Sequence, residues 1–582
     1  MICNFSFIQK NINAFVLAGL VVWCIVLYSL PLGSPYFHFD DKISIETNDV
    51  IKQLDVDQLF EVFNTRFLVG LSFAVNYALG GMYPFSHRLI NILIHVFNAF
   101  LVYLLVRTIL GLPVVKAKSG AQYAPIFASL LFLSHPIQTE TVNFITQRFV
   151  LLGSFFYLLT VLLFMQFRLH SQIKYLVGAL GSALSAMFCK EFTVTLPLML
   201  ALCDIYFLSD LRESRGKRFK FLIPFLLMIC VIPFTLLKTS TKTTGAASIA
   251  SYNLIQDAGG RVIKKEVDIT KAQGVKITRR EYFLTQLNVV RTYLRLLVLP
   301  IHQNIDYDYP ISHKLDLRTI LSGMFLFLFL SAGIFIYKKE RLISFCIMWF
   351  FLALSVESSF IPIAHVIAEY RLYLASFGFV LGVAYLLTRL HLRSFVPALI
   401  ILLIASGMTW KRNDIWADEI KLWRDTVNKS PFKQRPYINL AGAYLIDQQY
   451  AKALPLLVEA IAIDPSSAVA YFNLACVYQD LDDRQNALFY ALKAAELEST
   501  NAVYQQKVGF IYWKEKDFLS AIKYYANALN IKPNEYNARE YLKIVFAYYA
   551  AEKNREKALQ YANLLEIQHF DDSANYLRSL IK

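Results

Sequence analysis

The sequence is poor in charged residues and in cysteine. Only 17% of its 582 residues are Asp, Glu, Lys or Arg, whereas 56% are hydrophobic. This balance excludes an ordinary soluble protein and indicates a polytopic membrane protein with a soluble part attached. Five of the seven cysteines lie in or beside apolar segments: Cys24, Cys189, Cys203, Cys230 and Cys346. Their spacing excludes a disulfide framework and a cysteine-based zinc site.

A small-residue cleavage site is also missing after the first apolar run, at residues 11–33. We therefore expect a retained first membrane helix rather than a removed signal peptide. The net charge of +15 comes largely from short basic clusters between apolar segments. Such clusters are typical of cytoplasmic loops beside anionic lipid, so membrane lipid and not nucleic acid is the expected partner.

About eleven apolar segments follow one another up to residue 410. They lie at 11–33, 88–112, 122–134, 148–167, 175–189, 191–209, 219–237, 317–337, 341–356, 371–388 and 394–410. A helix of roughly 20 apolar residues crosses a bilayer. The sequence thus predicts an all-α fold, in which residues 1–410 form a membrane helix bundle of about eleven spans.

The loops between these segments divide into two populations. With the N-terminus in the cytoplasm, alternate loops are basic, at 116–118, 168–174, 212–220, 338–341 and 389–393, as the positive-inside rule requires. The opposite loops contain a different set of side chains: Asp40, Asp41, Glu61, His135, Glu140, Arg148, Lys190, Glu191, His302, Asp306, Asp308, Glu357, His365, Glu369 and Arg371. All candidate functional charges therefore fall on one, non-cytoplasmic face.

Two of the outer loops are long. The loop at 34–87 contains an apolar stretch, 66–79, that is too short to span and is predicted to be a helix in the membrane interface. The loop at 238–281 is polar, and residues 282–300, which include Arg291 and Arg295, form a second predicted interfacial helix. A further membrane span is the alternative for this last segment.

An internal period of 34 residues appears after Trp410. It relates Tyr444, Tyr478 and Tyr512, and also Ala453, Ala487 and Ala521. This spacing is typical of tetratricopeptide (TPR) helix pairs. We predict a linker helix at 411–433 and a TPR solenoid at 434–582, with three clear repeats and a degenerate fourth near 536–568. Because an odd number of spans precedes it, the solenoid is expected outside the cytoplasm.

The charges of the outer face fit one type of chemistry. Asp40 and Asp41 could act as a general base toward an acceptor hydroxyl. Arg148, Lys190 and Arg371, each at the mouth of a span, could hold a phosphate. A base facing a phosphate clamp at a membrane surface suits group transfer from a lipid-phosphate carrier, in which the growing charge of the leaving phosphate must be stabilised.

Structural interpretations compete with each of these assignments. Asp40 and Asp41 could lie in a solvated acidic loop, and Arg148 and Arg371 could anchor span ends. The neighbours Lys190 and Glu191 could neutralise each other. Two pairs could bind a divalent metal instead; they are His135 with Glu140, and His365 with Glu369 four residues later.

Several motifs, in this order, resemble one known family. They are residues 39–41, 66–68, 71–73 and 76–81, the set His87, Asn91 and His95, residues 135–142 with Arg148, the pair 190–191, residues 369–373, and Trp416, Glu419 and Trp423. The pattern resembles the transmembrane-and-TPR-containing O-mannosyltransferases over nearly the whole chain. It departs from the family at Phe67, where a proline is usual, in the short repeat array and in the loop at 238–281.

The resemblance implies a GT-C type glycosyltransferase with an inverting mechanism. The implied donor is a polyprenyl- or dolichyl-phosphate sugar, and the implied catalytic carboxylate lies in the first outer loop, with Asp40 as the first choice and Asp41 as the second. Arg148, Lys190 and Arg371 are then the donor-phosphate residues. The supporting or substrate-binding residues are Arg66, His87, His135, Glu140, Glu191, His365 and Glu369.

Three functions are therefore compared. The leading one is transfer of a lipid-linked sugar, with mannose as the extrapolation, to a protein acceptor recruited by the repeats. An oligosaccharide ligase with a pyrophosphate-linked donor is the second, and it would depend on 238–281 or 300–315 rather than on Asp40. A membrane-anchored TPR scaffold is the third. A bacterial inner membrane with periplasmic repeats is favoured over the endoplasmic reticulum with lumenal repeats.

Overall fold

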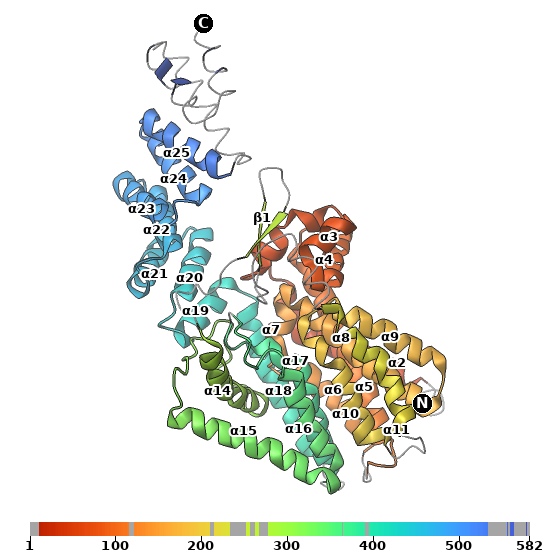
Figure 1. The fold of residues 1–582 in the computed structure, drawn as a ribbon. Coiled ribbons are helices and arrows are strands. Elements are labelled where there is room, and N and C mark those ends of the chain that lie inside the picture. Colours follow the sequence, from red (N-terminus) through yellow and green to blue (C-terminus); the bar gives the residue numbers. More distant parts are fainter. Residues whose placement is uncertain are drawn as a thin grey trace, which may run out of the picture. The chain divides into compact units, whose positions relative to one another are not determined.

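The computed structural model describes residues 11–115, 121–209, 215–232, 252–256, 262–266, 277–363, 365–389 and 395–532, with single positions between 556 and 578. The described chain is helical (Figure 1) except for strands β1 (Tyr252–Gln256) and β2 (Val262–Glu266), which pair with each other. It divides into two compact units, Met1–Leu254 with Lys264–Leu422 and Ile255–Ile263 with Trp423–Lys582. The predicted helical class is confirmed.

The first unit contains helices that are apolar on all sides. Six stretches of the described chain are long and apolar enough to cross a membrane: α2 (Ile12–Leu32), α5 (Pro84–Leu110), η4 with α8 (Ile145–His170), η5 to η6 (Glu191–Leu208), α15 with η7 (Leu317–Lys338) and η8 with α17 (Glu369–Thr388). Three shorter apolar helices are α6 (Ala124–Ser134), α9 (Ile173–Met187) and α16 (Arg341–Leu354). The protein is a membrane protein, but the predicted count of about eleven spans is not confirmed.

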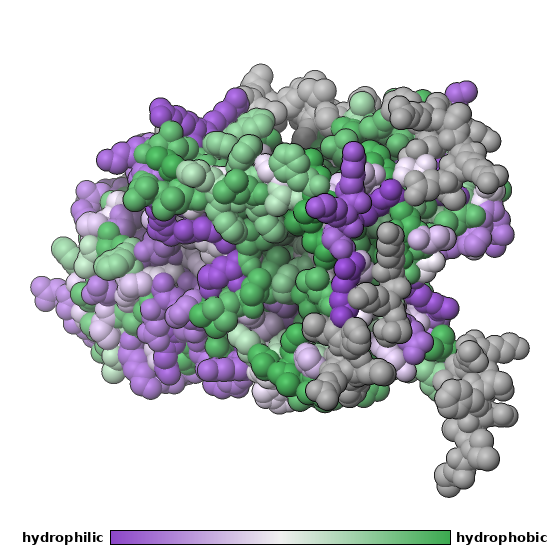
Figure 2. All heavy atoms as spheres, turned by 90° about the horizontal axis from the view of Figure 1, so that it is seen from below, coloured by the Kyte–Doolittle hydropathy of each residue, from purple (hydrophilic) through white to green (hydrophobic). Residues whose placement is uncertain are grey.

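These helices pack in sequence-adjacent and sequence-distant pairs. α8 packs on α9, α5 on both α6 and α8, α2 on α5, and α16 on α17. Trp349 and Tyr157 are fully buried between them, and Figure 2 shows that apolar side chains also cover broad areas of one outer face. A helix that is apolar on every side can pack against other helices on one side and against lipid tails on the other, because both surroundings are apolar.

The close approach of α17 to α16 depends on one glycine, which gives a first prediction. A Cβ atom added at Gly378 would lie 2.7 Å from the carbonyl oxygen of Cys346, whereas one added at Gly382 would lie 3.6 Å from the Cys346 sulfur. We expect Gly378→Ala to lower the free energy of unfolding by about 1–3 kcal/mol through overpacking, and the matched Gly382→Ala not to. Thermal unfolding in detergent checks this, and equal melting temperatures would contradict it.

The ends of the helices gather at two opposite ends of the bundle. At one end, Arg107 donates to Asn13 at 2.8 Å, and Arg168 and Arg389 form ion pairs with Asp204 and Glu340 at 3.2 and 2.8 Å. These contacts join the segments that the sequence assigns to the cytoplasmic side. The outer loops meet at the other end, so the division of the loops into two populations agrees with the fold.

The long outer loops carry short helices. The first contains η1 (Lys42–Glu46), η2 (Asp49–Lys52), α3 (Val56–Phe63), η3 (Asn64–Arg66) and α4 (Phe67–Gly80), which confirms the helix predicted at 66–79. α14 (Arg279–Val298) begins with a Thr278–Glu281 capping box and is not among the candidate spans. This favours the interfacial interpretation of residues 282–300. α11 (Arg215–Met228) and α18 (Phe395–Trp416) complete the unit.

The second unit consists of helix pairs. After α19 (Glu419–Lys429) come α20 (Gln434–Ile446) with α21 (Tyr450–Ile463), α22 (Ala468–Asp480) with α23 (Arg484–Leu497), and α24 (Ala502–Lys514) with α25 (Phe518–Ile531). The three predicted repeats are confirmed. Ala453, Ala487 and Ala521 are buried where the paired helices cross. The predicted fourth repeat lies mostly outside the described residues.

Candidate functional site

Segments far apart in the sequence are joined at the outer end of the bundle. Arg88, at the start of α5, donates to the carbonyl oxygens of Ser34 and Tyr36 just after α2. His38 contacts the Trp416 carbonyl oxygen at 3.1 Å with its Nε2 atom. That ring nitrogen must carry the proton to make this contact. These bonds fix the acidic segment that follows residue 38 against the ends of α5 and α18.

Asp40 is positioned by a strained neighbour. Phe39 has a φ of 50°, a left-handed conformation that a bulky residue rarely adopts and that is often found beside functional groups. The Phe39 ring packs between the rings of Phe144 and His365, each with its centroid 6.0 Å away. Asp40 is half-buried and directly follows Phe39, whose packing keeps this part of the loop beside His365.

The carboxylate of Asp41 has a different role. It is fully buried and accepts hydrogen bonds from the backbone N–H groups of Thr146 (2.7 Å) and Ile145 (3.2 Å) and from the Thr146 hydroxyl (2.5 Å). Burial raises the pKa of Asp41 to about 7, against these donors and the charge of Arg88, which lower it. Asp41 thus caps the turn that leads into α8, and this arrangement does not fit a base that meets an acceptor.

Lys190 is the centre of a charged cluster. Its Nζ atom forms an ion pair with Glu357 at 3.1 Å and lies 4.3 Å from the centroid of the Tyr370 ring. The residue is 8% exposed, and burial lowers the pKa of the Lys190 ammonium, which the charge of Glu357 opposes. Tyr370 therefore packs against the cation of Lys190.

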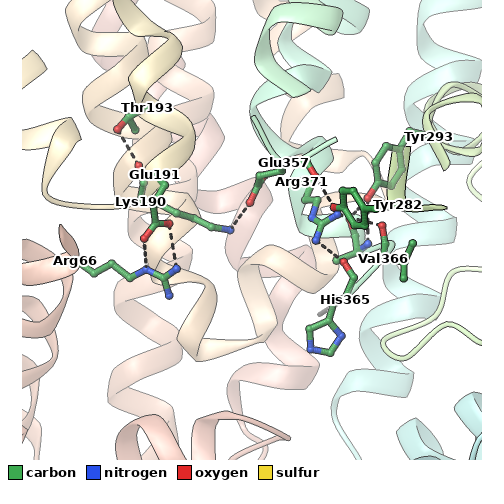
Figure 3. A network of polar contacts seen from close by, with 11 residues as sticks. Arg66, Lys190, Glu191, Thr193, Tyr282, Tyr293, Glu357, His365, Val366 and Arg371 are labelled. Atoms are coloured by element: carbon green, nitrogen blue, oxygen red, sulfur yellow. Dashed lines mark hydrogen bonds and ion pairs between the residues drawn. The ribbon is translucent and has the colours of Figure 1, made fainter. Parts of the chain in front are cut away.

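Glu191 pairs with a different cation. Its two carboxylate oxygens accept bidentate hydrogen bonds from Nε and Nη2 of Arg66, both at 3.0 Å (Figure 3). In place of the alternative in which Lys190 and Glu191 form a pair, the structure shows each of them in an ion pair with another segment. Each of these neighbours extends to another segment, so residues 190–191 hold the first outer loop and the segment before α17 together.

Arg371 lies on the far side of Glu357 from the Arg66–Glu191 pair (Figure 3). Its guanidinium donates to the carbonyl oxygens of His365 (2.5 Å) and Val366 (3.2 Å). Its Nε atom is buried and has no hydrogen-bond partner in the described part of the chain. The ring of His365 points away from this guanidinium (Figure 3). The guanidinium of Arg371 is thus held mainly by backbone carbonyl oxygens, with its Nε–H left unpaired among the described residues.

Arg148 does not fit the predicted role of a phosphate ligand. It is fully buried, and its guanidinium donates to Asn91 (2.8 Å), to Asn76 and the His87 carbonyl oxygen (both 2.9 Å) and to the Ser72 carbonyl oxygen (3.3 Å). It also lies 4.4 Å from the centroid of the Phe73 ring. With these contacts Arg148 joins α4, α5 and α8, which makes it a structural residue.

Two of the predicted site histidines, His135 and His87, are also buried in the protein and not exposed to a substrate. His135 is buried, its Nε2 atom contacts the Leu297 carbonyl oxygen at 2.9 Å, and its Nδ1 atom accepts from the Ile137 N–H at 3.2 Å. Burial lowers the pKa of His135 to about 4, so the ring is neutral. His87 is fully buried between the rings of Phe37 and Phe73.

Glu140 and Glu369 form a buried acidic pair. Glu369 accepts hydrogen bonds from the Gln303 amide (2.6 Å), the Asn304 N–H (2.7 Å) and the Tyr307 hydroxyl (2.6 Å). Burial and the neighbouring charge of Glu369 raise the pKa of Glu140 well above its usual value. The pair joins α7 (Gln138–Asn143) to the loop before α15 and to η8.

Neither candidate metal pair fits this geometry. Both ring nitrogens of His135 and both carboxylate oxygens of Glu369 are already used in hydrogen bonds to protein groups. Over the described ranges, no three His, Cys, Asp or Glu side chains lie close enough together to hold a metal ion. The site that remains consists of Asp40, His365 and the cations Arg66, Lys190 and Arg371.

Comparison with known proteins agrees with the motif pattern. The chain is 25% identical over 450 residues to human protein O-mannosyl-transferase TMTC3 (72% of this chain, 47% of that protein) and 26% identical over 483 residues to protein O-mannosyl-transferase F38B6.6 of Caenorhabditis elegans (77% and 62%). Drosophila melanogaster Tmtc1 is 30% identical over 215 residues (34% and 24%). The predicted resemblance is confirmed. The chain covers less than two thirds of the length of each of these relatives: 24%, 47% and 62%.

The repeats are matched separately. The family model described as tetratricopeptide repeat matches residues 468–501 and 502–535, the second and third of the three helix pairs. Among solved structures, MamA is 19% identical with a TM-score of 0.21, covering 29% of this chain and 88% of that chain. YrrB is 18% identical with a TM-score of 0.22, covering 32% and 91%.

Several residues of the candidate site could not be found from the sequence, although others lie in motifs that resemble the O-mannosyl-transferases. Glu357 was expected on the same face as Lys190, but the sequence did not pair them, because α11, α14, α15 and α16 lie between them in the chain. No sequence motif marks the three donors to Glu369, which are Gln303, Asn304 and Tyr307. They are ordinary loop residues that the fold brings next to this carboxylate. Tyr370 lies within the motif at residues 369–373, and this was the only indication in the sequence that it belongs to the site.

Proposed function

We propose that the protein is a membrane glycosyltransferase. It moves a sugar, mannose by analogy with its relatives, from a polyprenyl- or dolichyl-phosphate carrier to a hydroxyl group of a protein acceptor on the non-cytoplasmic face. The observation that carries this proposal is the packing of Phe39, the neighbour of Asp40, on His365. The His365 carbonyl accepts from Arg371, in the same network as the Lys190–Glu357 pair (Figure 3). A half-buried carboxylate and a group of cations meet at the end of a membrane bundle.

The proposed reaction is a single displacement. Asp40 accepts the proton of the acceptor hydroxyl while the oxygen attacks the anomeric carbon of the donor sugar. The bond from that oxygen to the anomeric carbon forms as the bond from the carbon to the phosphate oxygen breaks. The electron pair leaves with the carrier phosphate, and the configuration at the anomeric carbon is inverted.

Cationic side chains would stabilise the leaving phosphate. Lys190 has ammonium hydrogens beyond the one directed at Glu357, and Arg371 has a buried Nε group with no described partner. Charge-assisted hydrogen bonds of this kind are strongest in a site that excludes water. Arg66 and Glu191 hold the first outer loop against residue 190, and Asp41 fixes the start of α8.

The repeats supply the protein acceptor in this proposal, because helix-pair solenoids bind extended partners on their surfaces. The lipid tail of the donor stays in the bilayer while its head group reaches the outer end of the bundle. A bacterial inner membrane with periplasmic repeats is the favoured location, and the endoplasmic reticulum with lumenal repeats is the alternative.

A comparison of donors tests the proposal. Purified full-length protein is incubated with a Ser/Thr-containing peptide and with mannose on polyprenyl phosphate, an oligosaccharide on polyprenyl pyrophosphate, or a nucleotide-linked mannose. We expect glycopeptide, detected by mass spectrometry, with the phosphate-linked donor alone. Product from the pyrophosphate donor instead would favour the oligosaccharide ligase. No product from any donor with folded protein would contradict enzymatic transfer.

A further inference from the structure

Helix α14 has two polar faces that contact different parts of the protein. On one face, Tyr282, Gln286 and Tyr293 donate to the carbonyl oxygens of residues 357, 366 and 368, at 2.8, 2.8 and 3.0 Å. These carbonyls belong to the segment that carries the candidate site. The other face, with Thr285 and Asn288, contacts the segment that leads into α15. α14 therefore lies between the candidate site on its first face and the segment before α15 on its second face.

A small cavity lies on that second face. It has a volume of about 190 Å³ and is lined by Asn288, Tyr309, Ser312, Lys314, Asp316 and Arg318, among others. Its floor is fixed, because the Asn288 amide donates to Ser312 (3.1 Å) and Thr319 (2.9 Å) and accepts from Ser322 (2.7 Å). The volume is below the ~300 Å³ of pockets that enclose drug-sized ligands, so the cavity suits a head group rather than a whole sugar-lipid.

The rim of the cavity is cationic. Lys314 and Arg318 are exposed, and neither forms an ion pair with any residue between 277 and 363 or elsewhere in the described ranges. The nearby acidic groups are already engaged: Asp316 accepts from the Thr319 N–H at 2.8 Å, and Glu281 pairs with His313 at 2.7 Å. Asp316 also lines the cavity and its charge interacts with that of Arg318. With Lys314 as the second cation, the positive charges at the rim still outnumber this carboxylate, which favours an anionic ligand.

The helix that leaves this cavity is exposed along its apolar length. α15 is a candidate membrane span with only 22% of its apolar window buried, and Leu317, Leu321 and Leu328 on it are exposed at 71%, 53% and 62%. Such a surface is stable only against lipid chains. An anion bound at Lys314 and Arg318 would thus have acyl chains beside it, running along α15.

We infer that the cavity between α14 and α15 binds the phosphate head group of an anionic glycerophospholipid of the surrounding membrane, with its chains against α15. A phosphate can accept hydrogen bonds from both an ammonium and a guanidinium, and Lys314 and Arg318 line the same cavity. The hydroxyl groups of Tyr309 and Ser312 are already hydrogen-bonded to Thr292 and Asn288, so the two cations are the groups that would hold the phosphate. This site is separate from the candidate transferase site and does not depend on the proposed function.

Native mass spectrometry of full-length protein tests the inference. Delipidated protein is titrated with phosphatidylglycerol, phosphatidylcholine, polyprenyl phosphate or inorganic phosphate. We expect one tightly bound phosphatidylglycerol, and about 30-fold weaker binding in the double variant Lys314→Gln/Arg318→Gln, since each cation near a membrane surface attracts anionic lipid. The matched control Lys514→Gln/Lys516→Gln removes two exposed cations at the end of α24, in the helix-pair unit, and should bind like the wild type.

Three results would overturn the inference. One is equal binding of phosphatidylglycerol by the wild type and Lys314→Gln/Arg318→Gln, with thermal unfolding showing both to be folded. Another is equal binding of phosphatidylglycerol and phosphatidylcholine by the wild type, which would mean that the rim does not select charge. The third is a Lys314- and Arg318-dependent preference for polyprenyl phosphate or inorganic phosphate over phosphatidylglycerol, which would assign the cavity to another phosphate source.

Discussion

Asp40→Asn is expected to lower the rate of sugar transfer by about 10²–10⁴-fold, the usual contribution of a general base. The amide keeps the size of the side chain but cannot accept the proton of the acceptor hydroxyl. Asp40 is half-buried and is not the cap of α8, so the melting temperature should stay at the wild-type value. Initial rates with a polyprenyl-phosphate sugar and a Ser/Thr peptide check the loss of transfer. Thermal unfolding of the same samples checks the melting temperature.

The matched control for Asp40→Asn is Asp57→Asn, which makes the same change at an exposed position of α3 in the same outer loop. It should transfer sugar at the wild-type rate. Wild-type turnover by Asp40→Asn would remove Asp40 as the base. A lowered melting temperature together with lost turnover would mean instead that Asp40 supports the fold.

Arg148→Met is expected to destabilise the protein by about 3–5 kcal/mol, the cost typical of breaking a buried charged network. The substitution leaves Asn91, Asn76 and two buried carbonyl oxygens without their donor. Buried polar groups that lose a partner retain their full desolvation penalty. The melting temperature in detergent measures the effect.

A phosphate-binding role for Arg148 predicts a different result. Arg148→Met would then keep the wild-type melting temperature and raise KM for the lipid-phosphate donor. The matched control is Arg279→Met, at an exposed position in the first turn of α14, which should change neither quantity. A folded Arg148→Met variant with a raised KM would restore the phosphate role that the geometry of Arg148 argues against.

The helices and their grouping could be predicted from the sequence. The apolar segments at 11–33 and 317–337 appear as α2 and α15, and the 34-residue period appears as three helix pairs. Hydrophobic length and small residues at fixed spacing are local signals, so one sequence suffices to locate them. The division of the loops into two populations also succeeded, because it follows from alternation along the chain.

The roles of individual side chains could not be predicted in the same way. Asp40 and Asp41 are neighbours, yet one is half-buried while the other caps a turn at residues 145–146. Lys190 and Glu191 likewise extend to partners at 357 and 66. Which cation stays available to a phosphate depends on contacts between segments that are more than a hundred residues apart, and no local pattern encodes them.

Photolabelling of the donor site tests the central claim most directly. A polyprenyl-phosphate sugar with a photoreactive group on the sugar is crosslinked to the full-length protein, and labelled peptides are identified by mass spectrometry. The account predicts label in peptides that contain residues 38–41, 188–191 or 357–371. Label confined to 168–174, 338–341 or the region around 389, at the opposite end of the bundle, would contradict it.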